Sequence, residues 1–175
     1  MDFFFIETAF EVIDMRSFSN LWFWIALAVM WSTASYWVVG VPLDLVRRAA
    51  KGDRAALADA HQLGTIHARR LIHVAAVSGL LMTGFTFFVL TALALLGFLY
   101  RVEFAQAVFL LLLPMSLVGW LNLRTARRVA TVPPPLLPGL MLGHRRVVQG
   151  IGVVSIFVTS MWGMWTNVNA NVLGG

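Results

Sequence analysis

The chain has 175 residues, of which 59% are hydrophobic and only 12% are charged. A soluble domain carries about 25% charged residues, so this composition predicts a membrane protein. The chain contains no cysteine, which excludes disulfides, thiolate zinc sites and iron–sulfur clusters held by the chain itself. The net charge of +5 does not indicate nucleic-acid binding, because the basic residues lie beside apolar segments and no groove-reading motif is present.

Residues 1–19 are predicted to form an amphipathic helix on the outer membrane surface. Phe3, Ile6, Phe10 and Ile13 recur at helical spacing, and acidic residues occupy the opposite stripe. This acidic start also differs from the basic start of a secretory signal peptide.

Four apolar segments are long enough to cross a bilayer, which requires about 20 helical residues. The predicted spans cover residues 20–42, 71–98, 104–123 and 147–167. The sequence therefore predicts an all-α membrane protein with four transmembrane helices in a single domain, residues 1–175.

The two longer connections, 43–70 and 124–146, have different compositions. In 43–70 we expect a short surface helix that Asp53 caps and Gly64 ends. The segment 124–146 includes the apolar stretch "TVPPPLLPGLMLGH", whose four prolines disfavour a continuous helix. We expect it to lie in the membrane interface or against a partner, or to follow the headgroups as an extended linker.

Eleven of the thirteen basic residues lie in these two connections. The positive-inside rule then places both connections in the cytoplasm and both termini outside, in a bacterial inner membrane. Eight of these residues form pairs beside the predicted spans: Arg47, Arg48, Arg69, Arg70, Arg127, Arg128, Arg145 and Arg146.

Two of the arginine pairs, 69–70 and 145–146, precede predicted spans. Positive charge at a helix start opposes the helix dipole, at a cost of about 0.5 kcal/mol. Attraction to an anionic leaflet is worth about 1 kcal/mol per residue and exceeds that cost. We interpret the pairs as contacts for anionic lipid headgroups. The alternative is a docking face for an acidic soluble protein or for a bound phospholipid headgroup.

Small residues within the spans predict close contacts between helices. Ala75, Gly79 and Thr83 are spaced by four residues, and Gly150 and Gly152 lie in the last span. Such residues allow helix backbones to approach each other in a membrane.

The sequence gives little indication of chemistry. The middle of each span lacks acidic residues and arginine, which disfavours a pump or coupled transporter. His73 and His144 both lie near the inner leaflet, and they are the candidates for axial ligands of a b-type haem or for a metal. Histidines bonded to water or phosphate at the interface are the alternative. We predict no catalytic residue and no cofactor.

Two stretches, "EVIDMRSFSNLWFWIALAVMWSTASYWVVGVPLDLVRRA" and "FVLTALALLGFLYRVEFAQAVFLL", resemble uncharacterised alphaproteobacterial membrane proteins. Some of these are labelled as components of the SufBCD complex, which assembles iron–sulfur clusters. The resemblance covers roughly the first three spans and carries over no functional residue. It implies a membrane anchor whose basic inner face meets a soluble complex.

Together these features predict a non-enzymatic accessory or scaffold subunit of the inner membrane. Its partners would be anionic lipids and a larger protein complex or further copies of itself. Two alternatives stay open, a haem- or quinone-linked redox subunit and a small oligomeric channel or carrier.

Overall fold

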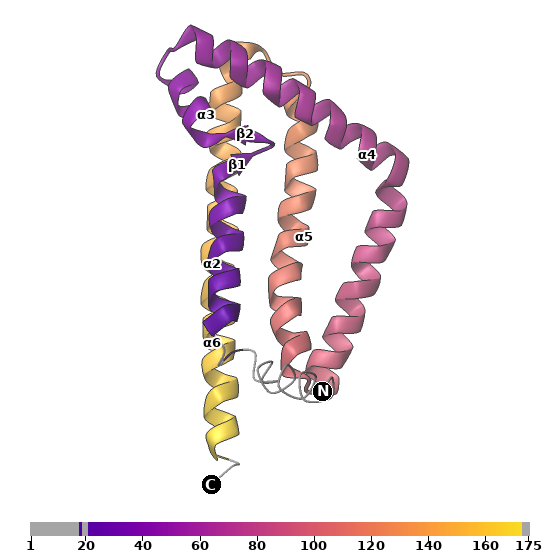
Figure 1. The fold of residues 1–175 in the computed structure, drawn as a ribbon. Coiled ribbons are helices and arrows are strands. Elements are labelled where there is room, and N and C mark those ends of the chain that lie inside the picture. Colours follow the sequence, from indigo (N-terminus) through magenta and orange to yellow (C-terminus); the bar gives the residue numbers. More distant parts are fainter. Residues whose placement is uncertain (1–17, 19–20, 173–175) are drawn as a thin grey trace, which may run out of the picture.

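The computed structural model describes residue 18 and residues 21–172 (Figure 1). The predicted outer helix at 1–19 therefore lies outside the described residues, apart from Phe18. The described elements are α2 (Leu21–Tyr36), β1 (Trp37–Val38), β2 (Val41–Pro42), α3 (Leu43–Ala50), α4 (Arg54–Ala94), η2 (Leu95–Leu99), α5 (Glu103–Val129), η3 (Pro134–Leu136) and α6 (Leu137–Val172).

Three helices, α4 with η2, α5, and α6 with η3, are long and apolar enough to cross a membrane. The most apolar stretch of α4 has no buried residue, so its side chains suit a hydrocarbon environment better than water. The fourth predicted span differs. Its helix, α2, has 16 residues, which gives about 24 Å of length at 1.5 Å per residue. It lies beside α6 (Figure 1).

A β-hairpin replaces the last part of the predicted span 20–42, because the helix ends at Tyr36. Strands β1 and β2 pair antiparallel around a two-residue turn. Both turn residues, Val39 and Gly40, have positive φ, at 51° and 80°, as a type I′ turn requires. A side chain on Gly40 would come within 2.5 Å of the His67 ring, so this position requires glycine.

Helix α4 corrects the prediction of a separate short helix in 43–70. Asp53 does cap its N-terminus, since the Asp53 carboxylate accepts a hydrogen bond from the Ala56 amide at 3.0 Å. The helix does not end at Gly64, however, but continues to Ala94. A Cβ on Gly64 would lie 2.9 Å from Met141 Cε, so this glycine provides space for packing. The first half of α4 crosses the end of the bundle, and the second half turns to run down it (Figure 1).

The proline-rich connection is shorter than the predicted 124–146. Helix α5 continues to Val129 and α6 begins at Leu137, so only the prolines at 133–135 and their neighbours separate the two helices. The fourth proline, Pro138, falls in the first turn of α6. It is tolerated there because the first backbone N–H groups of a helix have no partner within the helix.

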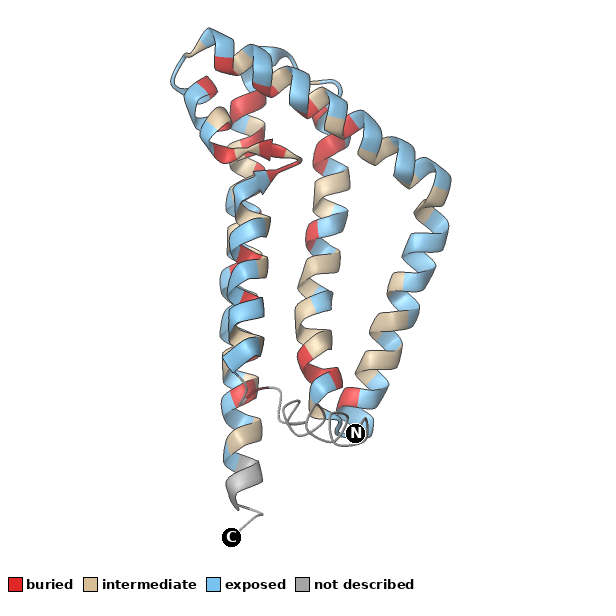
Figure 2. Ribbon diagram, in the orientation of Figure 1, coloured by how far each residue is buried: buried red, intermediate tan, exposed pale blue. Residues whose placement is uncertain are grey.

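The main core lies at one end of the bundle, where Figure 2 shows the buried residues gathered. Its buried members are Val38, Val39, Val41, Val46, Ala49, Ala56, Ala60, Ala68, Ala126, Val129, Leu137 and Met141. We call this end the basic end: it comprises the hairpin, α3, the first half of α4, the end of α5 and the start of α6. A smaller cluster, Leu27, Trp31, Val118 and Val148, joins α2, α5 and α6 lower down.

Candidate functional site

The four predicted arginine pairs lie on four elements that meet at the basic end (Figure 1). Arg47 and Arg48 occupy the last turn of α3, and Arg127 and Arg128 occupy the last turn of α5. The pairs 69–70 and 145–146 lie within α4 and α6. All eight side chains are exposed except Arg145, which is half-buried. The fold thus concentrates positive charge on one end of the molecule.

The predicted conflict with the helix dipole is wrong, because neither pair in question begins a helix. Arg69 lies about four turns after the start of α4, at 3.6 residues per turn. Arg145 lies two turns into α6, and its Nε donates a hydrogen bond of 3.1 Å to the Ser35 carbonyl oxygen. That oxygen belongs to the last turn of α2, where a positive charge is favourable.

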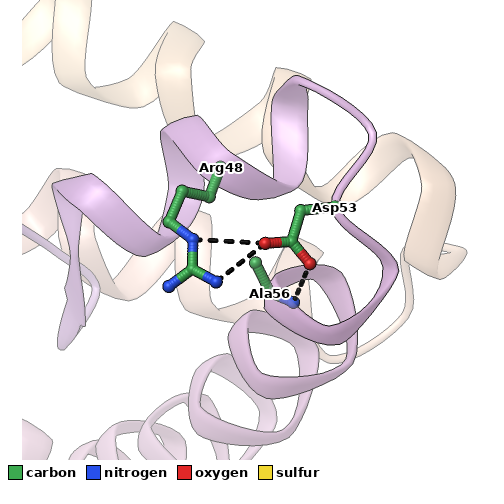
Figure 3. Close-up of polar contacts among 3 residues, drawn as sticks. All are labelled: Arg48, Asp53 and Ala56. Atoms are coloured by element: carbon green, nitrogen blue, oxygen red, sulfur yellow. Dashed lines mark hydrogen bonds and ion pairs between the residues drawn. The ribbon is translucent and has the colours of Figure 1, made fainter.

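Arg48 is paired with an acid of the same end (Figure 3). Its Nη2 lies 2.7 Å from Asp53 Oδ2, and its Nε donates to the same oxygen at 3.2 Å. The Ala56 amide donates to the other carboxylate oxygen. The pKa of Asp53 is lowered, first by the Ala56 hydrogen bond and then by Arg48. Arg48 therefore links α3 to α4, and less of its charge is available to an external anion.

A cavity lies between the second half of α4 and α5 and extends to α6. Its larger part has a volume of about 1160 Å³ and the part nearer the hairpin about 720 Å³. Leu71, Val74 and Gly119 line both parts, so the two parts adjoin at these residues of α4 and α5. The larger part is lined mainly by apolar residues of α4, α5 and α6.

Polar residues line the cavity where it reaches the basic end. They are Thr33 at the end of α2, His67 and Arg70 in α4, and Asn122 in α5. We call these four residues the polar mouth. The two adjoining parts therefore combine a cationic, hydrogen-bonding lining near the hairpin with a long apolar lining along α4, α5 and α6.

The residues predicted to pack helices together differ in what surrounds them. Ala75, Gly79 and Thr83 line the cavity, and a Cβ on Gly79 would meet no atom within 4 Å. Gly150 likewise lines the cavity with open space around it. A Cβ on Gly152, by contrast, would lie 2.9 Å from Trp31 Cε3. Of these three glycines, Gly152 is therefore the one that brings two helices of the chain close together.

The two histidine candidates also differ in their surroundings. His144 is buried in α6, with its Nδ1 2.8 Å from Thr125 Oγ1 in α5. His73 is exposed on α4. Within the described residues, no group of three or more histidine, aspartate or glutamate side chains is placed to hold a metal ion. The buried imidazole thus serves a contact between α5 and α6.

Gln106 is among the buried polar residues that sequence reasoning missed. Gln106 is 7% exposed, and its Nε2 donates to the Gly97 carbonyl oxygen at 2.7 Å. Its Oε1 accepts from Trp162 Nε1 at 2.9 Å. One amide therefore joins η2, α5 and α6 at the end opposite the basic end. An isolated amide within an apolar segment, shortly after the turn between η2 and α5, is the sequence signal for such a contact.

No family model, no curated protein and no solved structure matches this chain.

Proposed function

We propose that the protein is an accessory or scaffold subunit of a bacterial inner membrane, crossing it four times with the basic end in the cytoplasm. The short helix α2 is the fourth crossing. It lies along α6 (Figure 1), and Trp31 of α2 packs on Gly152 of α6. Exposed apolar side chains such as Leu21, Trp22 and Val29 would then contact lipid.

The observation that carries this proposal is the distribution of charge. The four arginine pairs, together with Lys51, Arg54 and Arg124, belong to elements of the basic end. Within the described residues, Arg101 is the one basic residue of the opposite end. The positive-inside rule favours a cytoplasmic location for such a basic end. An exposed basic side chain without an acidic partner would gain about 1 kcal/mol from an anionic leaflet, and Arg48, which is paired with Asp53, would gain less.

A scaffold role follows from the same surface, because exposed arginines bind carboxylates and phosphates with paired hydrogen bonds. The resemblance noted above gives a first partner to test, the soluble complex that assembles iron–sulfur clusters. The haem alternative has less support, because His73, the second of the two candidate ligands, is exposed on α4.

Cysteine labelling tests the orientation sharply, since the chain has no cysteine of its own. Lys51→Cys places a thiol at the basic end, and Tyr100→Cys places one at the opposite end; both positions are exposed. A membrane-impermeant maleimide added to intact cells should label the variant at position 100. It should label the variant at position 51 only after the membrane is permeabilised. The reverse pattern would refute the orientation.

The scaffold role is tested by isolating the protein in a gentle detergent, with and without the basic surface. The unmodified chain should retain a partner at fixed stoichiometry, with the iron–sulfur assembly complex as the first to probe by antibody. Arg127→Gln and Arg128→Gln together should weaken that retention. Recovery of the chain without any stoichiometric partner from native lipid would contradict a scaffold role.

A further inference from the structure

The cavity beside α4 differs in size and character from an ordinary small-molecule site. Such sites measure about 300–1,000 Å³ and bury most of a compact ligand. Here the larger part alone measures about 1160 Å³, and exposed Met82, Phe87 and Val154 are among its lining residues. Those exposed apolar walls suit a molecule that lies partly in the bilayer and partly within the protein.

The polar mouth determines which end of such a molecule enters there. Arg70 supplies a permanent positive charge with a planar set of donors, and Asn122 and His67 lie in the same lining. The turn between β1 and β2 fixes one wall of the polar mouth, because Gly40 packs directly on the His67 ring. Among the described residues, no aspartate or glutamate lines either part of the cavity. The mouth is therefore complementary to an anionic group rather than to a neutral or cationic one.

The interior is long enough for the acyl chains of one leaflet. From Arg70 to Thr83 the length along α4 is about 20 Å at 1.5 Å per residue, whereas one leaflet contributes about 15 Å of hydrocarbon. Gly79 lies about 14 Å along the helix from Arg70 by the same rise. Hydrocarbon chains that start at the mouth would thus pass Ala75 and Gly79, where the absence of side-chain bulk leaves room for them.

We propose that this cavity binds one anionic phospholipid, with its phosphate held at Arg70 and its acyl chains lying along Ala75, Gly79 and Thr83. The small residues of α4 then serve as a groove for a lipid, rather than for another helix of this chain. The inference places the lipid headgroup at the basic end. It rests on the proposed function in one respect only: if the basic end is cytoplasmic, the lipid comes from the cytoplasmic leaflet.

Native mass spectrometry from detergent tests the proposal with two probes, phosphatidylglycerol and phosphatidylcholine of the same acyl chains. The unmodified chain should retain phosphatidylglycerol in preference to phosphatidylcholine. Arg70→Gln should weaken phosphatidylglycerol retention about fivefold, the loss of about 1 kcal/mol expected for one arginine near a lipid phosphate. Arg69→Gln is the matched control: this neighbouring arginine is exposed and outside the lining, so its variant should retain the lipid as the unmodified chain does.

A second pair of variants tests the groove. Gly79→Leu fills it and should abolish most retention of both lipids, whereas Gly84→Leu should leave retention unchanged. Neither glycine has an atom within 4 Å of an added Cβ, and only Gly79 lines the cavity. Circular dichroism of each variant verifies that the helices have formed.

Three results would overturn the proposal: equal effects of the substitutions at 69 and 70, no effect of Gly79→Leu, or equal retention of the two lipids by the unmodified chain. Equal effects at 69 and 70 would show that the lipid is attracted only by the general charge of the basic end. None of these results depends on the orientation in the cell, which cysteine labelling decides separately.

Discussion

Replacing Gln106 with leucine should destabilise the protein by about 1 to 3 kcal/mol. The substitution keeps an unbranched attachment at Cβ and a similar volume, but it removes both hydrogen bonds of the side chain. Trp162 Nε1 and the Gly97 carbonyl oxygen each lose their Gln106 partner. Hydrogen bonds between side chains in a membrane protein contribute about 0.6 kcal/mol on average and up to about 1.7 kcal/mol, and two of them give the stated range.

The close approach around Gln106 makes compensation difficult. A Cβ on Gly97 would lie 2.9 Å from the Gln106 backbone nitrogen, so η2 and α5 are already in contact. Phe98 also packs edge-on against Trp162, with the ring centroids 5.4 Å apart. These contacts fix the positions of both hydrogen-bond partners, and neither can readily turn towards a new one.

The assay is a double-mutant cycle of Gln106→Leu and Trp162→Phe, with unfolding by sodium dodecyl sulfate followed by circular dichroism in mixed micelles. The coupling free energy should be about 1 kcal/mol, because the single substitutions remove the same hydrogen bond. Gln149→Leu serves as control. Gln149 is a half-buried residue of α6 that makes no side-chain hydrogen bond within the described part of the chain. A coupling near zero, or an equal loss of stability from Gln149→Leu, would refute the reasoning.

Three further predictions concern the basic end and its neighbouring helix contact. Gly152→Leu should cost about 1–3 kcal/mol in unfolding free energy, because the added side chain meets the Trp31 ring. Gly40→Ala should lower the unfolding midpoint, since it combines a positive φ with a clash against His67; His67→Ala should restore part of the loss. The lowered pKa of Asp53 means that its carboxylate stabilises the fold at neutral pH. This contribution is lost as the pH falls from the ordinary pKa of 3.8 through the lowered value, so Asp53→Asn should show a smaller loss of stability in acid than the unmodified chain.

Each of these three predictions has its own control. Gly150→Leu introduces the same side chain into open space in α6, and a loss equal to that of Gly152→Leu would show that general helix effects dominate. A failure of His67→Ala to rescue Gly40→Ala would attribute the whole effect to the backbone. If unmodified and Asp53→Asn proteins lose stability identically between neutral and acidic pH, the ion pair with Arg48 contributes nothing measurable.

Sequence patterning predicted the helical class and the long apolar helices, because the apolar segments at 71–98, 104–123 and 147–167 are uninterrupted by charge. It failed where a local signal was weaker than tertiary packing. Gly64 has the usual character of a helix end, but in the fold it accommodates Met141. The apolar composition of the segment before Leu43 predicts a helix, although Val and Trp are also common in strands.

The candidate site could be anticipated in part. The clustering of arginines depends only on which loops share a side of the membrane, and the positive-inside rule predicts that side. The cavity could not be predicted, because small residues such as Gly79 favour close helix contact as readily as open space. Whether α4 packs on α5 along its whole length is decided by its tertiary contacts at both ends. The sequence of the middle turns does not contain that information.

Different parts of α4 make their van der Waals contacts with different partners. The first half belongs to a packed core, and Gln106 holds the far end through Gly97, but the turns between them border the cavity. Those turns obtain much of their dispersion energy from surrounding amphiphiles. A measured free energy of unfolding will therefore vary with the chain length of the detergent or lipid, and values from different micelles are not comparable as properties of the polypeptide alone.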